Sequence, residues 1–331
     1  MVWKKLFATL ITCALISCQP TAPSTRTTST ATAQSPVPTK NPDSNITSPA
    51  LYVDHMLVHD LFEGAVIIGK YDAMQYYGSP DEAFSMLCCR LTEHLDAEDY
   101  TRNASWVSHY EMDMLTPLSL MPDNLERLSN ADIEHGNLVF LRKARAWQTE
   151  DSLLAIENGK SYFDYLILSP TKDGWQIAQI DTAYPTENLL GNMSPDATAT
   201  AQTPSPSAYL ETVASQPDTY LSLARVSGFL TRADLRLRGI TNKAVLPDDE
   251  FEENLTNFVE QLNQPQRVIV EQLLPLPFTE SGSSMTSTDI QQHRVVIEAK
   301  LSVDGDPMLW FFTLEHSEGG LQIVRVAQHY P

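Results

Sequence analysis

Two histidines with the spacing of paired metal ligands stand near the start of the globular sequence, at His55 and His59. On a helix, residues four apart share one face, so both imidazoles could bind the same ion. A zinc site needs a third and a fourth ligand, and the sequence offers none that can be identified. We therefore expect a solvated polar face here and assign no metal ligand.

The string Ser169-Pro170-Thr171-Lys172 has the serine–lysine spacing of penicillin-interacting enzymes. In those enzymes the serine opens a helix and works with S-D-N and K-T-G elements, which this sequence lacks. Here Ser169 ends a predicted strand and enters a predicted turn. We therefore expect no nucleophile at this position.

Carboxyl and phenol groups occur together on the predicted late strands of the first half, at Tyr162, Asp164, Asp181 and Tyr184. An Asp base and a Tyr donor inside one pocket can carry out proton transfer. These residues match no enzyme motif, so we expect solvent-facing aspartates and tyrosines at the edge of the core. The sequence indicates no catalytic residue and no cofactor. It favours a non-enzymatic protein and leaves the question of enzyme activity open.

Of the four cysteines, only Cys88 and Cys89 lie in the globular sequence. The apolar spacing from Phe84 to Leu95 predicts an amphipathic helix with Cys88 on its apolar stripe. A disulfide between neighbours needs a strained ring that a regular helix cannot hold. We expect buried structural thiols. A redox or metal role is the alternative, although no second cysteine pair completes a site.

The N-terminus carries two lysines, an apolar run over residues 6–16, and then Ser17 and Cys18. This order is typical of an export signal, because the apolar run is too short to span a membrane. The string Leu15-Ile16-Ser17-Cys18 resembles the lipobox of bacterial lipoproteins. The resemblance implies that residues 1–17 are a signal peptide cleaved before Cys18. It also implies that Cys18 carries a diacylglycerol anchor with palmitate-type chains.

Two acyl chains hold a protein stably at a membrane. An Asp after the lipidated cysteine would resemble a retention signal for the inner membrane, and here Gln19 follows instead. We expect a protein anchored in the cell membrane or the outer membrane, facing the periplasm or the cell exterior.

Residues 18–50 are expected to form a tether. From position 19 to position 50 there are 8 Thr, 5 Ser and 6 Pro and almost no large apolar side chain. Burial therefore cannot offset the entropy of ordering this segment. A similar stretch at 191–208 predicts a linker between two α+β domains, at 51–190 and 209–331.

The charge balance limits the partners. There are 22 basic and 42 acidic side chains, and the formal net charge is −20. Phosphate binding requires a surplus of Lys and Arg, which excludes nucleic acid as a partner. A polybasic contact with anionic lipid is excluded for the same reason. The lipid on Cys18 is therefore the expected membrane contact.

The two predicted domains end alike. Residues 174–185 and 320–331 match at a constant offset of 146, with identical residues at five of twelve positions. Self-similarity at a fixed spacing is typical of an internal repeat. We expect a divergent tandem duplication.

Each domain is expected to place helices before an antiparallel meander. In the first domain the predicted helices are 79–95 and 97–110, and the predicted strands are 137–147, 152–157, 162–169 and 175–183. In the second domain they are 220–236 and 248–263, followed by 267–274, 294–303, 308–315 and 321–327. This is an α+β order. It resembles the NTF2-like, or cystatin-like, cone fold, which implies a curved sheet wrapped on a helix, sometimes with a pocket.

These patterns predict a lipid-anchored extracytoplasmic protein with a non-enzymatic binding or scaffold role in the cell envelope. Its partner would be an envelope protein. The alternative is that cone pockets bind, or act on, a small apolar ligand.

Overall fold

The computed structural model describes residues 55–104, 107–118, 136–148, 159–183, 217–240, 249–262, 265–279, 285–317 and 320–330. All of them belong to one compact unit, Ser48–Pro331. The predicted signal peptide, Cys18, the tether, the 152–157 strand and the 191–208 linker lie outside the described residues.

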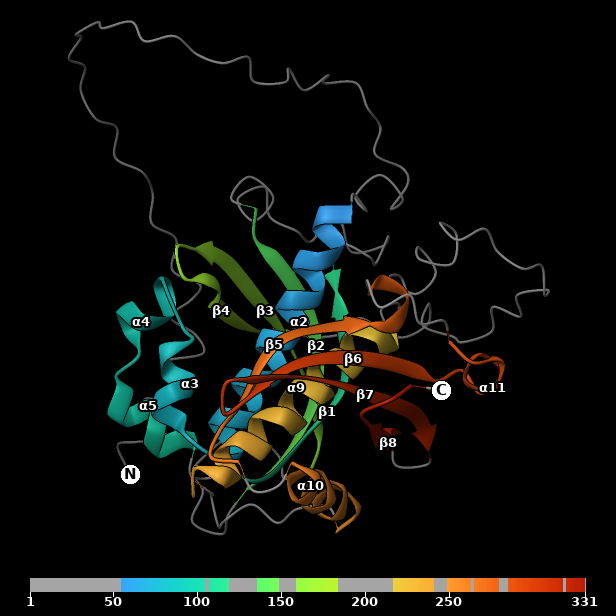
Figure 1. The fold of residues 1–331 in the computed structure, drawn as a ribbon. Coiled ribbons are helices and arrows are strands. Elements are labelled where there is room, and N and C mark those ends of the chain that lie inside the picture. Colours follow the sequence, from blue (N-terminus) through green and yellow to red (C-terminus); the bar gives the residue numbers. More distant parts are fainter. Residues whose placement is uncertain are drawn as a thin grey trace, which may run out of the picture. The chain divides into compact units, whose positions relative to one another are not determined.

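The first half begins with helices and continues as a sheet (Figure 1). Its helices are α2 (His55–Tyr77), α3 (Pro80–Ser85), α4 (Arg90–His94) and α5 (Ala97–Ala104). Its antiparallel strands follow in the order β1 (Val107–Pro117), β2 (Leu138–Gln148), β3 (Ser161–Thr171) and β4 (Gly174–Ala183).

The second half repeats this plan. Its helices are α9 (Pro217–Leu237), α10 (Asp249–Gln261) and the short α11 (Ser287–Gln291), with a 3-10 turn η5 (Leu276–Phe278). Its strands are β5 (Val268–Pro275), β6 (Val295–Val303), β7 (Asp306–Ser317) and β8 (Gly320–Ala327), again in chain order. The α+β class and the strands and helices predicted for this half are confirmed.

The two sheets share their irregularities as well as their order. Ala178 is skipped in the β3–β4 register and Val324 in the β7–β8 register, 146 positions later. Asp113 and Glu271 are skipped in the same way in β1 and β5. A bulge shifts the alternation of a strand by one residue. Two sheets with the same strand order and with bulges at corresponding positions support the predicted internal repeat.

Two predicted helices end earlier than expected. The helix starting at Ser79 stops at Ser85 instead of Leu95, because the next residues pair with β4. There, Leu87 forms a bridge with Ile177. The predicted 97–110 helix ends at 104, and strand β1 follows. In both places tertiary strand pairing prevails over local helical periodicity.

The halves share one core. Helices α2 and α9 lie side by side in Figure 1. Ser227 of α9 donates to the Val66 carbonyl of α2 at 2.7 Å. Phe62 of the first half packs on Tyr220 and Phe278 of the second, with ring centroids 5.8 and 4.9 Å apart. Each half therefore buries apolar surface against the other as well as within itself.

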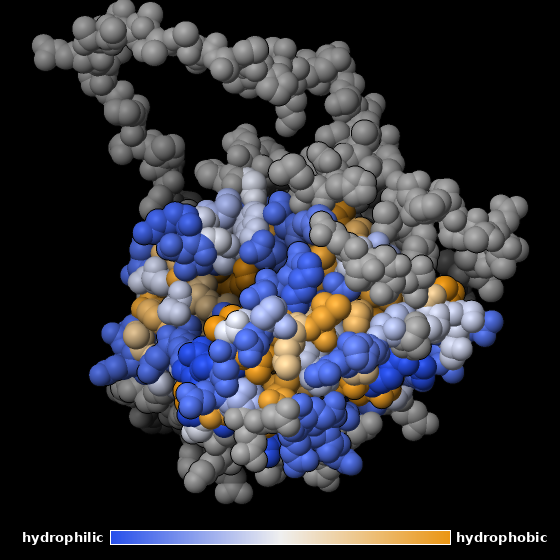
Figure 2. All heavy atoms as spheres, viewed as in Figure 1, coloured by the Kyte–Doolittle hydropathy of each residue, from blue (hydrophilic) through white to orange (hydrophobic). Residues whose placement is uncertain are grey.

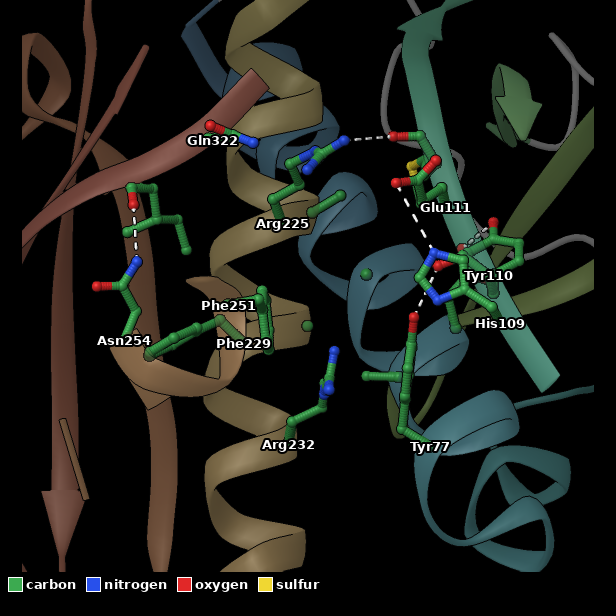
Figure 3. Close-up of a pocket in the computed structure, with 17 residues that line it drawn as sticks. Tyr77, His109, Tyr110, Glu111, Arg225, Phe229, Arg232, Phe251, Asn254 and Gln322 are labelled. Carbon is green, nitrogen blue, oxygen red and sulfur yellow. Dashed lines mark hydrogen bonds and ion pairs between the residues drawn. The ribbon is translucent and has the colours of Figure 1, made fainter. Parts of the chain in front are cut away.

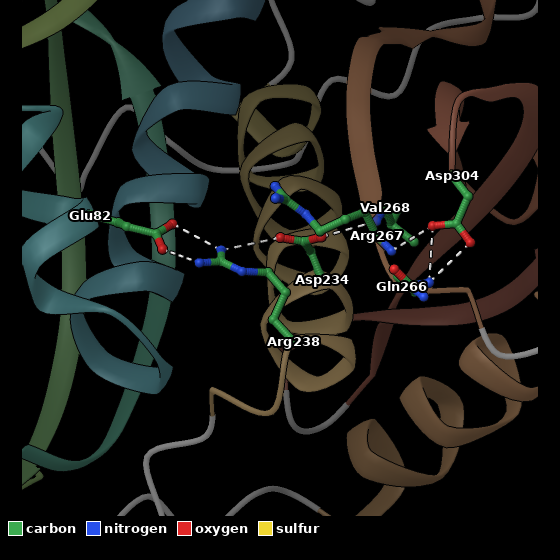
Figure 4. Close-up of polar contacts among 7 residues, drawn as sticks. All are labelled: Glu82, Asp234, Arg238, Gln266, Arg267, Val268 and Asp304. Carbon is green, nitrogen blue, oxygen red and sulfur yellow. Dashed lines mark hydrogen bonds and ion pairs between the residues drawn. The ribbon is translucent and has the colours of Figure 1, made fainter.

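A polar chain also crosses the junction (Figure 4). Arg238, just after α9, pairs with Glu82 of α3 and donates to Asp234 at 3.4 Å. Asp234 Oδ1 in turn accepts from the side chain of Arg267 and from the backbone N–H of Val268, both at 3.0 Å. The hydrogen bond from Arg238 lowers the pKa of Glu82. This chain ties α3 to the start of β5 through the end of α9.

Candidate functional site

A buried arginine links α2 to the first sheet. Arg142 on β2 donates to Asp72 Oδ1 at 2.6 Å and to Asp164 at 2.9 and 2.5 Å. The hydroxyl of Tyr110 donates to the second Asp72 oxygen at 2.6 Å. All four side chains are buried. The expectation that Asp164 faces solvent is therefore wrong, because Asp164 lies directly across the strand pair from Arg142.

The charges in this cluster compensate each other. Burial raises the pKa of Asp72, and the Arg142 charge opposes that rise. Burial lowers the pKa of Arg142, but the charges of Asp164 and Asp72 outweigh it and raise that pKa well above its ordinary value. Because both Asp72 oxygens already accept hydrogen bonds, the cluster holds α2 on the sheet and does not offer a general base.

The second half fills the matching place with apolar side chains. The register that sets Arg142 opposite Asp164 in the first sheet sets Ala299 opposite Trp310 in the second. Trp310 is fully buried, and its ring contacts Phe258 edge-on at 4.9 Å. The interiors of both sheet-and-helix units are therefore occupied by side chains.

A pocket lies instead where the two halves meet (Figure 3). Its lining comes from α2 and β1 on one side and from α9, α10 and β8 on the other. The cavity volume is about 150 Å³. Met112, Phe229 and Phe251 give it apolar walls, and Gly69 and Gly228 lie in its lining where α2 and α9 approach closely.

One wall is a layered cation–aromatic stack. The Arg232 guanidinium lies 3.9 Å from the Tyr77 ring centroid and 4.0 Å from that of Phe251. It also donates to Glu252 Oε1 at 2.9 Å. Burial lowers the pKa of Arg232, and the Tyr77 and Glu252 charges oppose that change. Stacking on two rings and a carboxylate partner together fix this side chain in place.

Arg225 has a hydrogen-bond donor that the protein leaves unused. Its Nη2 donates to the Met112 carbonyl at 3.0 Å, which joins α9 to β1. Its buried Nε–H has no hydrogen-bond partner. Burial lowers the pKa of Arg225, and the charges of Glu111 and Asp113 oppose this. A buried donor without an acceptor costs about 1–3 kcal/mol, and the Arg225 side chain also forms part of the pocket lining.

Two ionisable residues of β1 also border the pocket. His109 Nε2 lies 3.8 Å from Glu111 Oε1, and the His109 ring packs on Trp147 with centroids 4.7 Å apart. Arg145 pairs with Glu111 Oε2 at 2.6 Å. The neighbouring His109 side chain, together with the charge of Arg145, lowers the pKa of Glu111. Glu111 is therefore held as a paired carboxylate.

The histidine pair and the serine–lysine pair singled out from the sequence form no site among the described side chains. His55 begins α2, and exposed His59 contacts Phe62 edge-on with centroids 6.2 Å apart. Ser169 donates to Asn137 Oδ1 at 2.7 Å, while Lys172 stands exposed in the following turn. Within the described ranges, no three His, Cys, Asp or Glu residues are grouped as metal ligands.

The predicted acid–phenol set is only partly described. Tyr162 is half-buried, and burial raises its pKa to about 12. Asp181 pairs with Tyr165 in the sheet register, and its side chain lies outside the described residues, as does all of Tyr184.

The prediction that Cys88 and Cys89 are buried thiols on a helix is wrong in part. Cys88 is half-buried and Cys89 is exposed, because the helix that was to bury them stops at Ser85.

Sequence reasoning missed the residues that carry the chemistry of the junction. Arg142 had a weak signal, since it directly follows the apolar run Leu138-Val139-Phe140-Leu141 on a predicted strand, although Lys143 and Arg145 stand next to it. A charge in a buried strand requires a buried partner. Arg225 and Arg232 had no comparable signal, because helix α9 is amphipathic and tolerates arginines on its polar side.

No family model and no curated protein sequence matches this chain. Among solved structures it is similar to a cystatin-like protein from Ruminococcus gnavus. The two chains are 11% identical, and the match covers 83% of this chain and 87% of that one, with a TM-score of 0.13. A TM-score of this size carries no argument about function.

Proposed function

We propose that this protein is a non-enzymatic binding protein of the cell envelope, anchored by a lipid on Cys18. In this proposal the pocket between the halves receives a small apolar molecule that carries an oxygen acceptor. The observation that carries the proposal is an aromatic-walled cavity with the cationic Arg225 side chain in its lining. Apolar walls with one oriented polar group are typical of small-ligand sites.

The size of the cavity suggests the size of the ligand. In another protein an apolar cavity of about 150 Å³ binds benzene. A single ring with a carboxylate therefore matches both the volume and the Arg225 donor. Binding is favoured over catalysis, because the carboxylate of Asp72 is already satisfied by Arg142 and Tyr110.

Benzoate is the probe for this pocket. We expect benzoate to bind one-to-one to the full chain carrying Cys18→Ser, measured by calorimetry. Ala73→Leu should weaken binding by about tenfold or more, because Ala73 lines the cavity and the added carbons fill it. Lys172→Ala, in the exposed turn, is the control and should leave binding unchanged. Equal affinity in both variants would rule out this pocket as the binding site.

Toluene tests the role of Arg225. It has the ring of benzoate without the oxygen acceptor, so we expect benzoate to bind more tightly than toluene. Arg225→Met should remove that preference, provided that the variant melts cooperatively. A preference that survives in Arg225→Met would assign the acceptor to another group.

The lipid anchor has its own test. Cys18→Ser is expected to move the protein from the membrane fraction to the soluble envelope fraction, because two acyl chains are lost. Cys13→Ser, inside the predicted signal peptide, is the matched control and should remain membrane-bound. If Cys18→Ser also stays with the membrane, the anchor lies elsewhere. Among the described residues, no helix is long and apolar enough to cross a membrane.

A scaffold role is the second candidate function. Figure 2 shows apolar side chains in the middle of one face, bordered by polar ones. The large apolar residues that are exposed in the described ranges are Ile269, Ile290, Leu309 and Val324, all in the second half. An exposed apolar area bordered by polar residues, as on the face in Figure 2, is typical of a surface that binds a protein partner. Cross-linking in whole cells that returns no reproducible partner would count against this role.

A further inference from the structure

Adjacent cysteines rarely bring their sulfur atoms together. Side chains of neighbouring residues point to opposite faces in a strand and in different directions around a helix. In this protein, however, Cys88 Sγ lies 2.7 Å from Cys89 Sγ. This separation is longer than the S–S bond of a disulfide, which is about 2.05 Å, and both cysteines are free thiols.

The backbone at this point explains the contact. Cys89 has φ 60° and ψ −125°, a positive-φ conformation that non-glycine residues seldom adopt. It is the N-cap of α4, and its side chain makes no capping hydrogen bond there. Its side chain is therefore turned towards Cys88 instead of the helix end.

The preceding segment is held firmly on the first sheet. The Cys88 N–H donates to the Ile177 carbonyl at 2.9 Å, and the Ile177 N–H donates to the Met86 carbonyl at 3.0 Å. Leu87, between them, is buried in the core. These contacts fix Cys88 on β4 next to the Ala178 bulge, while Cys89 faces solvent.

We propose that Cys88 and Cys89 form a redox-active vicinal dithiol, which a low-molecular-weight or protein disulfide converts to a Cys88–Cys89 disulfide. The expectation that a helix forbids this ring does not apply, because the helix is broken at these residues. Extracytoplasmic compartments favour disulfides, so the site suits the proposed location but does not depend on the pocket or the anchor.

The thiol–disulfide exchange takes place in two steps. The Cys89 thiolate, which is exposed, attacks the oxidant disulfide to form a mixed disulfide and releases one thiolate. The Cys88 sulfur then attacks the Cys89 sulfur, closes the ring and releases the second thiolate, which takes up the Cys88 proton. The protein loses two electrons and two protons, and the oxidant becomes two thiols. Cys89 attacks first because it is the exposed thiol, whereas Cys88 is half-buried and burial raises its pKa.

Intact mass measurement tests this proposal. The full chain carrying Cys13→Ser and Cys18→Ser keeps only these two thiols. On titration with oxidised and reduced glutathione, we expect it to lose the mass of two hydrogen atoms without retaining glutathione. Cys88→Ser in the same background should instead hold one glutathione, because the mixed disulfide cannot be resolved.

Two further measurements separate the effect of the folded structure from the intrinsic reactivity of the two thiols. Before oxidation, the chain should bind one phenylarsine oxide across both thiols, and after oxidation it should bind none. In urea the chain is unfolded, so Cys89 is no longer held at a positive φ. Closing the disulfide ring should then need a higher ratio of oxidised to reduced glutathione. A stable glutathione adduct on the two-thiol chain, or a disulfide-linked dimer, would overturn the proposal.

Discussion

Arg142→Ala is expected to lower the free energy of unfolding by about 3–5 kcal/mol. The substitution leaves Asp72 and Asp164 buried without their cation, at 4% and 6% exposure. Desolvated carboxylates without a counter-charge are among the most costly groups in a core. Urea unfolding followed by circular dichroism measures the loss.

Arg145→Ala is the matched control on the same strand. Arg145 also pairs with two carboxylates, Glu111 and Asp113, but its side chain is 35% exposed. An ion pair with this access to water contributes about 0–1 kcal/mol. Equal losses in the two variants would show that burial does not govern the Arg142 cluster.

The loss of stability caused by Arg142→Ala should also depend on pH. Without the cation, burial raises the folded-state pKa of Asp72 above its unfolded value. A group with a raised folded pKa binds its proton more tightly in the native state, so its variant gains stability as the pH falls. The gap between Arg142→Ala and the natural protein should therefore narrow on acidification. A gap that widens would contradict this account.

Gly69→Ala is expected to cost about 2–3 kcal/mol of stability by overpacking the helix pair. A Cβ at Gly69 would stand 2.0 Å from the Ala224 carbonyl oxygen and 2.6 Å from its carbonyl carbon. The obstacle is backbone, so no side-chain rotation relieves it. The two helices must move apart, which opens the shared core and deforms the pocket.

Gly228→Ala is the control on the facing helix. A Cβ there would meet Gly69 O at 3.4 Å and Ala73 Cβ at 3.8 Å, both ordinary contacts. Alanine is the better helix former by about 1 kcal/mol, so Gly228→Ala should be neutral or mildly stabilising. Thermal and urea unfolding of both variants compare them directly. Similar losses of stability in Gly69→Ala and Gly228→Ala would mean that the close contact between α2 and α9 at Gly69 is not the cause of the loss.

The sequence predicted the elements whose pattern is local. The alternation in β2–β4 and β5–β8, the amphipathic spacing of α10, and the Ser79 cap all follow from neighbours a few residues apart. The bulges at Ala178 and Val324 keep the repeat offset of 146, although the sequence pattern did not predict them. The lipid on Cys18 stays a prediction from the N-terminal pattern.

Other features depend on partners that are distant in the chain. Asp72 and Arg142 are 70 residues apart, and the Arg225 bond to Met112 spans 113. No periodicity marks such pairs, because a strand or helix pattern shows which face is buried but not what lies opposite.

Local pattern therefore determined the α+β class and most of the strands, since each depends on the period of one segment. Tertiary packing alone decided three features: the start of β1 in place of a longer helix, the exposed vicinal thiols, and the pocket between the halves. In each, contacts with a distant segment outweigh local preference: β2 pairs with β1, β4 with Leu87, and α9 packs on α2. The physical reason is that strand pairing and burial in the shared core stabilise the fold by more than is lost when a helical turn does not form.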